Sequence, residues 1–310
     1  MRRRRAVAFL VGMTTVATAC REVSRANAGE KQKAELTARE GRLTRALANA
    51  DAASAPGKPL AKWILPAELL EVSGLALTGD GRLLAHNDEQ GKVFVIDPRR
   101  GVLLKTFTLG DRGVPADFEG IATAGSDIYL LASNGTVYQF QEGADGAAVQ
   151  YKQLNSRLGR ECEFEGVAID PDSAWILLPC KNVKKKGMRD QLVIYRWHPE
   201  RSDSSALSML TIPLEQVIGP NGWKSLHPSD ITIDPATGNY VLIASQEKAL
   251  IELTPAGDVV RSIILPGNPR QPEGVTISSD GILIVSDEGT KGWGSITLYK
   301  WPFAQSAASQ

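Results

Sequence analysis

Phe118-Glu119-Gly120-Ile121 is one of five related four-residue phrases that recur along the chain. The other four are Val72-Ser73-Gly74-Leu75, Phe164-Glu165-Gly166-Val167, Pro228-Ser229-Asp230-Ile231 and Pro272-Glu273-Gly274-Val275. Their second residues are 46, 46, 64 and 44 residues apart, and each phrase opens a unit of several short strands. A period of about 40 to 50 residues with several strands per unit is typical of a propeller. We therefore expect an all-β fold, a five-bladed β-propeller.

The strands in each unit are separated by turns rich in glycine, aspartate and proline, such as Ser279-Asp280-Gly281. The last unit ends after its third strand, Ser295 to Trp301. We expect Lys62 to Leu65, which precedes the first unit, to supply the missing fourth strand and to close the ring. This assigns residues 61–304 to the propeller and residues 305–310 to a disordered tail.

The first twenty residues have the features of an export signal. A basic stretch, Arg2 to Arg5, precedes a short apolar stretch, Ala6 to Val16, which is too short to span a bilayer as a mature helix. Ala17-Thr18-Ala19-Cys20 resembles the bacterial lipobox, in which the cysteine becomes the lipidated first residue. The alternative is an ordinary cleaved signal in which Cys20 is incidental. Residues 1–19 are thus predicted to be a lipoprotein signal peptide, and Arg21 after the cysteine resembles lipoproteins of the outer membrane that face the periplasm.

Residues 20–60 are predicted to be a lipidated tether, helical or disordered. The stretch Glu30 to Ala53 is rich in Ala, Glu, Lys, Arg and Leu, but its apolar stripe is narrow and Gly41 interrupts it. Without the four arginines of the signal, 31 basic and 35 acidic residues remain, a net charge of −4. This charge argues against nucleic acid as a partner. We expect a monomer held at the membrane through its lipid.

The repeated glutamates suggest a site on the propeller axis. In an antiparallel hairpin the start of the first strand lies beside the end of the second, so the second residues of the phrases share one face with the second-strand ends. Clustered carboxylates repel one another unless they protonate or share a cation, and oxygen ligands favour Ca²⁺. The candidate calcium ligands are Glu119, Glu165, Asp230, Glu273 and Asp287. The alternative is that each glutamate binds backbone amides of the next blade and only braces the ring.

Several motifs also resemble the SdiA-regulated (YjiK-like) family. They are Cys162-Glu163-Phe164-Glu165-Gly166, Leu177-Leu178-Pro179-Cys180-Lys181, His227-Pro228-Ser229-Asp230-Ile231, Gln271-Pro272-Glu273-Gly274-Val275 and Val285-Ser286-Asp287-Glu288-Gly289. The resemblance covers about residues 62 to 303. It implies a five-bladed propeller, distantly similar to NHL-repeat proteins, with a bound calcium ion, and it implies no established activity. Ser73, where other blades carry glutamate, is a departure from a full ring of acidic ligands.

Cys162 and Cys180 remain once Cys20 is assigned to the lipid. Their midpoint is residue 171, in the turn Asp170-Pro171-Asp172, so they are expected to lie across from each other on neighbouring strands. In an exported protein such a pair forms a disulfide when the geometry suits it. The alternative is two buried thiols or a pair that binds a soft metal.

The usual catalytic motifs of serine hydrolases, zinc proteases and phosphate-binding loops are not found in the sequence. His86 and His227 fall on the predicted ligand face, and Asp88 and Glu288 are the acidic alternatives for a general base. Our first hypothesis is a non-enzymatic, calcium-binding lipoprotein that binds an unidentified ligand or protein of the cell envelope. The second is a calcium-dependent hydrolase, phytase-like or lactonase/esterase-like, that uses the axial metal. The third is a scaffold in which the glutamates only brace the ring.

Overall fold

The computed structural model of the chain describes residues 12–50, 57–289 and 292–302. It divides into two compact units, Met1–Ala48 and Asn49–Gln310. The predicted basic stretch Arg2 to Arg5, most of the apolar stretch and the tail 305–310 lie outside the described residues.

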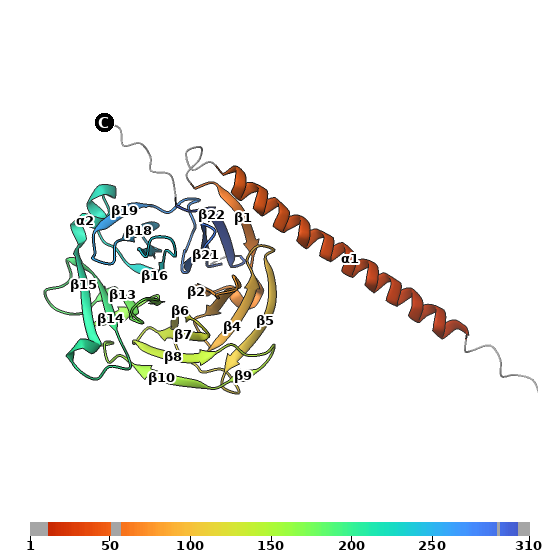
Figure 1. Cartoon of the computed structure of the whole chain (residues 1–310), viewed down its shortest axis with the longest axis horizontal. Helices are drawn as coiled ribbons and strands as arrows, with labels where there is room; N and C mark the ends of the chain where they lie inside the picture. Colours follow the sequence, from red (N-terminus) through yellow and green to blue (C-terminus); the bar gives the residue numbers. More distant parts are fainter. Residues whose placement is uncertain (1–11, 51–56, 290–291, 303–310) are drawn as a thin grey trace, which may run out of the picture. The chain divides into compact units, whose positions relative to one another are not determined.

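The second unit is a propeller of five sheets arranged around an axis, antiparallel except for one short strand in blade 1 (Figure 1). Blade 1 contains β2 (Val72–Leu77), β3 (Leu83–Asn87), β4 (Lys92–Asp97) and β5 (Val102–Leu109), with the short β9 (Ala148–Val149) parallel to β5. Blade 2 contains β6 (Phe118–Ala124), β7 (Asp127–Ala132), β8 (Thr136–Gln141) and β10 (Tyr151–Asn155). The five-bladed, mostly β fold predicted from the repeats is confirmed.

Blades 3 to 5 follow the same order. Blade 3 pairs β11 (Cys162–Phe164) and β12 (Ala168–Ile169) with β13 (Ile176–Val183), followed by β14 (Gln191–Trp197) and β15 (Leu207–Pro213). Blade 4 contains β16 (Pro228–Ile233), β17 (Tyr240–Ala244), β18 (Ala249–Leu253) and β19 (Val259–Ile264). Blade 5 contains β20 (Val275–Ile277), β21 (Ile282–Asp287), β22 (Ser295–Lys300) and β1 (Pro59–Ile64).

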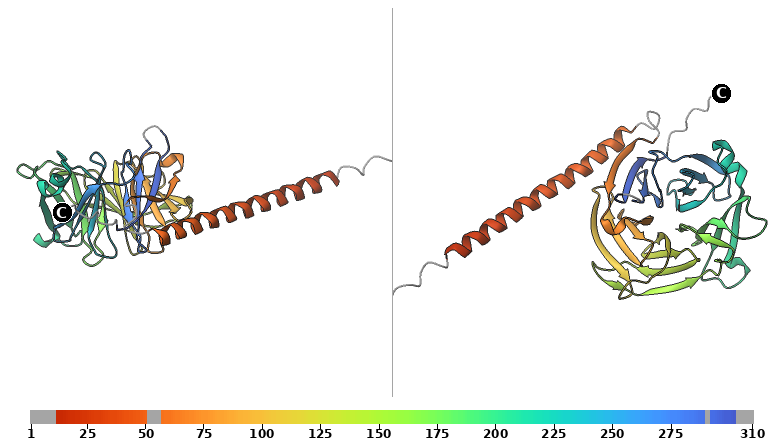
Figure 2. Two further views of the ribbon diagram at one scale, coloured as in Figure 1. Left: turned by 90° about the horizontal axis from the view of Figure 1, so that it is seen from above. Right: turned by 180° about the vertical axis from the view of Figure 1, so that it is seen from behind.

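Strand β1 closes the ring, as predicted. It pairs antiparallel with β22, with Lys62 opposite Thr297, so the segment before blade 1 completes blade 5. The short helical elements lie in connections: α2 (Leu214–Ile218) and the 3₁₀ turns Ala67–Leu69, Ser204–Ala206 and Gly219–Asn221. Figure 2 shows the propeller edge-on in its left view.

The hydrophobic core lies between neighbouring blades. One cluster joins blades 1 and 2, where the rings of Phe107 and Phe140 meet edge-to-face at 6.1 Å. Another joins blades 3 and 4, with Leu177 and Leu242 fully or almost fully buried. Because each sheet covers the apolar face of the next, the ring of blades folds as one unit and holds the axial loops in place.

The first unit is dominated by the helix α1 (Gly12–Asn49), which contains Cys20 and most of the predicted tether. Of the two alternatives for residues 20–60, helix is therefore found up to Asn49, and residues 51–56 lie outside the described part. In the described part of the chain, no helix has both the length and the apolarity to cross a membrane.

Candidate functional site

β-Bulges occur where the repeated phrases enter their strands. The register shifts at Ser73 in blade 1, at Glu119 in blade 2 and at Ser229 in blade 4, so these residues have no partner in the ladder. A bulge bends its strand and redirects a side chain, and bulges are common beside functional sites. The end of the axis where these bulges lie is called the mouth below.

The mouth brings together three glutamates from different blades and one lysine. Glu119, Glu165 and Glu273 interact electrostatically with Lys181, and Glu165 and Glu273 both act on Glu119. The ammonium of Lys181 donates to Oε1 of Glu165 and forms an ion pair with it. The Glu165 side chain is only 7% exposed and that of Lys181 27%. We call these four residues the axial cluster.

Burial raises the pKa values of the three carboxyls, and neighbouring acids raise those of Glu119 and Glu165 further. Desolvation, followed by the charge of Glu165, raises the pKa of Glu119 to about 9. Desolvation raises the pKa of Glu165 to about 7, although its hydrogen bond to Lys181 acts in the opposite direction. The pKa of Glu273 is raised by desolvation, against hydrogen bonds from Ser245 and Gln271. At neutral pH Glu119 is therefore protonated, and the cluster carries less negative charge than three free carboxylates.

The pKa of Lys181 shifts in the direction that keeps it charged. Burial favours its neutral amine, but the hydrogen bond to Glu165 and the charges of Glu165, Glu119 and Glu273 outweigh burial, so the pKa rises above its usual value. From the sequence, the clustered glutamates were expected either to be protonated or to share a cation. The raised pKa of Glu119 favours its protonated form, and the ammonium of Lys181 is a cation that the chain itself supplies.

Further acids surround the axial cluster. The pKa of Glu288 is raised by burial and by the charges of Glu273, Glu71 and Asp88. The pKa of Asp88 is raised by burial and then by Glu71. We call Glu71, Asp88 and Glu288, together with the three glutamates of the axial cluster, the acidic mouth. Its excess of negative charge favours positively charged ligands.

Asp230, another predicted calcium ligand, already uses both of its carboxyl oxygens as hydrogen-bond acceptors. Its carboxylate is fully buried and accepts from the backbone N–H of Ile231 (2.8 Å) and of Val275 in blade 5 (2.7 Å). Burial raises its pKa well above the usual value, while these amides act the other way. Ser229 adds a hydrogen bond to the carbonyl of Pro272 (2.8 Å). The bracing role considered for the glutamates is thus the one found at Asp230.

Asp230 occupies a narrow neck in which the backbones of the blades approach each other. A Cβ on Gly120 would lie 2.8 Å from Cα of Gly166, and a Cβ on Gly166 would lie 2.6 Å from Cα of Asp230. Glycine is needed at these positions because a side chain has no room. Beyond the neck, a cavity of about 230 Å³ is lined by aliphatic side chains such as Leu75, Ile121 and Val167.

The other predicted ligand, Asp287, hydrogen-bonds to a neighbouring loop. Its Oδ1 accepts from the backbone N–H of Gln271 at 2.8 Å. Among the catalytic candidates, His86 is fully buried and its Nδ1 donates to the carbonyl of Asn87 (2.9 Å). Burial lowers the pKa of His86 to about 4, so it is neutral at pH 7. A dissolved substrate has no access to a side chain in this position.

His227 has a different environment, which sequence reasoning did not foresee. Its Nδ1 lies 2.8 Å from Oε1 of Glu247, and its backbone N–H donates to Oε2 of the same residue. Ser225 also donates to Glu247 (3.0 Å). A carboxylate at one ring nitrogen fixes the orientation and tautomer of a histidine. Glu247 lies in the loop that joins β17 to β18. The only feature of the sequence that points to Glu247 as a partner of His227 is this position at the end of a second strand.

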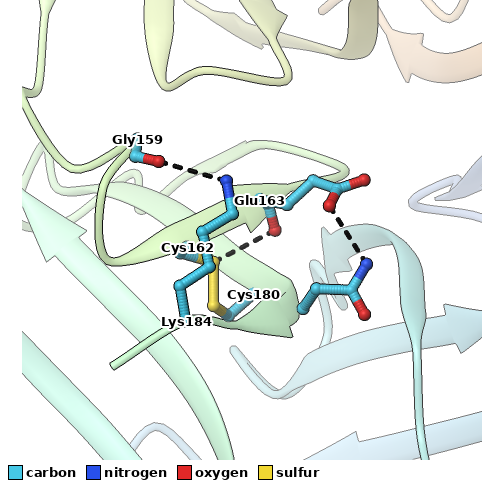
Figure 3. The surroundings of a disulfide bond; sticks show 6 residues. Gly159, Cys162, Glu163, Cys180 and Lys184 are labelled. Carbon is cyan, nitrogen blue, oxygen red and sulfur yellow. Dashed lines mark hydrogen bonds between the residues drawn. A yellow bond between two sulfur atoms is a disulfide. The ribbon is translucent and has the colours of Figure 1, made fainter. Parts of the chain in front are cut away.

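The predicted disulfide between Cys162 and Cys180 is present, with Cα atoms 5.7 Å apart. It joins β11 and β13, but the cysteines are not directly opposite: Cys162 faces Val183 and Cys180 faces Phe164. The reason is that Ile169 pairs with Ile176, so the hairpin is centred beyond residue 171. Figure 3 shows its surroundings, in which Lys184 donates to the carbonyl of Gly159 (3.2 Å). The disulfide thus ties down blade 3 next to Lys181.

The arrangement of the mouth does not fit a calcium ion. Within the described residues, no group of three or more His, Cys, Asp or Glu side chains is placed to hold a metal ion. Ca²⁺ usually takes about six to eight oxygen ligands. Here Lys181 lies against Glu165, Asp230 is used by amides and Asp287 by Gln271. Calcium binding stays a prediction.

Comparison with protein families supports part of the resemblance. Residues 220–301 match the model of a family described as SdiA-regulated. This segment includes blade 4 and the three strands of blade 5 that follow it. The comparison with curated protein sequences gave no match.

Solved structures share the fold at low identity. Glutaminyl cyclase from Myxococcus xanthus aligns with a TM-score of 0.55 and 12% identity, over 79% of this chain and 98% of that protein. A luciferin-regenerating enzyme aligns with a TM-score of 0.52 and 11% identity, over 80% and 97%. A structural genomics protein of unknown function from Bacteroides thetaiotaomicron aligns with a TM-score of 0.45 and 15% identity over 76% of this chain, which spans only 54% of that protein. At these identities the likeness concerns the fold alone.

Proposed function

We propose that this protein is a lipid-anchored binding protein of the cell envelope, and that its ligand carries positive charge and binds at the acidic mouth. The observation that carries the proposal is the group of acids with raised pKa values at one end of the axis: Asp88, Glu119, Glu165, Glu273 and Glu288. Their repulsion costs free energy, and a bound cation relieves it. The lipobox-like sequence ending at Cys20 supports the anchor, and the outer membrane facing the periplasm is the proposed location.

Spermidine, a small trivalent cation, is a suitable probe. We expect it to bind the purified protein at low ionic strength and to dissociate as salt is added, because exposed charges are screened. Glu288→Gln should weaken binding by up to about fivefold, the range for one partly exposed ion pair. The matched control is Asp172→Asn, since Asp172 is exposed in the turn at the opposite end of blade 3. Binding by isothermal titration calorimetry that is equal in all three proteins, or absent, would contradict the proposal.

The hydrolase alternative keeps one supporting observation, the pair formed by His227 and Glu247. A histidine oriented by a carboxylate is the usual form of a general base. Turnover of ester, lactone or phosphate substrates that depends on calcium and is lost in His227→Gln would favour this alternative over a binding protein.

A further inference from the structure

Lys181 differs in charge from the residues at the same place in the other blades. In blades 1 to 4 the first residue of the repeated phrase pairs with a residue of the second strand. The place meant here is the residue that comes directly after that partner in the sequence. In blade 5 it is Glu288, whose N–H donates to the carbonyl of Gln271, as that of Ser133 does to Asp117. The five equivalent residues are Asp88, Ser133, Lys181, Ser245 and Glu288. Blade 3 alone places a cation there.

Both neighbours of Lys181 along the chain are fixed. Cys180 is joined to Cys162 by the disulfide. On the other side, the amide of Asn182 donates to Oε2 of Glu163 at 3.1 Å. Because the backbone is held on both sides, the lysine stem leads its ammonium to Glu165 at little further cost in entropy.

An ammonium at this place competes directly with a divalent cation. Lys181 pairs with Glu165, the most deeply buried carboxylate of the axial cluster, and also interacts with Glu119 and Glu273. A metal ion bound by these carboxylates would lie within contact distance of the ammonium, and like charges repel strongly in a partly buried site. The two cations therefore exclude each other.

We propose that the ammonium of Lys181 takes the place of the calcium ion that the family resemblance implies. The axial cluster is then a metal-free network in which one lysine pairs with Glu165 and interacts with Glu119 and Glu273 from two other blades. Blade 3 carries its own cation, so the state of the mouth is independent of the calcium concentration around the protein.

Calcium titration of four forms of the full-length protein tests this role. The key variant is Lys181→Met, which keeps the length of the stem and removes the charge. Lys181→Arg keeps the charge, and Lys186→Met removes an exposed lysine of the same blade as a matched control. We expect wild type, Lys181→Arg and Lys186→Met to bind Ca²⁺ with a Kd of about 1 mM or weaker. Lys181→Met should bind one Ca²⁺ about tenfold tighter or more, and calcium should raise its thermal unfolding midpoint alone.

A second variant keeps the test sharp. Lys181→Met combined with Glu165→Gln removes both members of the ion pair, so it should fold and lose the gain in calcium affinity. Lys181→Gln replaces Lys181→Met if near-ultraviolet circular dichroism shows that the methionine variant does not fold. The proposal is overturned if wild type binds one Ca²⁺ as tightly as Lys181→Met, or if the folded neutral variants bind it no tighter than wild type.

Discussion

Glu119 combines burial with three acidic neighbours, Glu165, Asp117 and Glu273. Its carboxyl receives no hydrogen bond from the described residues, and the charges of Glu165 and Asp117 disfavour its ionised form after desolvation does. A neutral carboxylic acid at pH 7 donates a hydrogen bond as well as accepting one. The carboxyl of Glu165, with a pKa of about 7, changes its charge closer to neutral pH than that of Glu119, which keeps its proton up to about pH 9.

This pKa predicts a decrease in stability with rising pH. The folded-state pKa of about 9 lies above the ordinary value of 4.5, so the folded protein keeps a proton that the unfolded chain has lost. The contribution of Glu119 to stability is lost as pH rises through this range. We expect urea denaturation to give a lower free energy of unfolding at about pH 8.5 than at about pH 6.5, and Glu119→Gln to reduce the difference.

Between these two pH values His86 contributes little to the change in stability, although its own effect has the opposite sign. With its pKa lowered to about 4 by burial, His86 adds stability that is lost only as pH falls below its usual value of 6.5. Glu215→Gln, at an exposed residue of α2, is the control and should behave as wild type. Equal pH differences in wild type and Glu119→Gln would show that Glu119 does not carry the effect.

At the scale of single residues, the meeting of the three glutamates was predictable from the sequence, but the lysine that pairs with them was not. The spacing of the repeats is enough to bring Glu119, Glu165 and Glu273 to one axis. Lysine at a strand end usually extends into solvent, so Lys181 gave no signal beyond its charge among acids and serines. Asp230 did carry a signal, because it stands where the other four phrases have glycine.

At the scale of strands, hydrophobic alternation and turn residues were sufficient for most bounds. The predicted third strand of the last unit, Ser295 to Trp301, differs from β22 (Ser295–Lys300) by one residue. The bulges were missed, since one extra residue leaves the composition of a strand unchanged. Cys180 faces Phe164 and not Cys162 for a different reason: Ile169 pairs with Ile176, so the hairpin is centred beyond residue 171.

The disulfide between β11 and β13 should contribute measurably to stability. It closes a loop with a sequence separation of 18 residues, for which the entropy of the unfolded chain predicts about 3 kcal/mol. We expect reduction with dithiothreitol to lower the urea midpoint of wild type towards that of the Cys162→Ser/Cys180→Ser double variant. The double variant itself should not respond to the reductant. A wild-type midpoint that is unaffected by complete reduction would refute this estimate.

For the whole molecule, the repeats predicted both the number of blades and the way the ring closes. What they did not predict is the extent of helix before the propeller, because the narrow apolar stripe of Glu30 to Ala53 is equally compatible with disorder. The structure finds helix as far as Asn49. Membrane attachment depends on chemistry at Cys20 and needs its own test.

Lipidation at Cys20 predicts the mass and labelling of the mature protein. In cells fed an alkyne fatty acid, wild type should incorporate the label and begin at Cys20 by intact mass spectrometry. Cys20→Ser should not be labelled, because the acceptor thiol is missing. Cys162→Ser is the control and should be labelled as wild type. Label retained in Cys20→Ser, or a wild-type chain that starts elsewhere without lipid, would exclude the anchor.

The carboxyl group of Asp230 fills the narrow neck of the propeller axis, so the axis is not an open channel. Water does not reach this residue, since it is fully buried where the blades meet. The acidic mouth and the cavity lined in part by Leu75, Ile121 and Val167 lie at opposite sides of this residue along the axis. The two faces of the propeller can therefore bind unrelated partners, because one buried aspartate separates them.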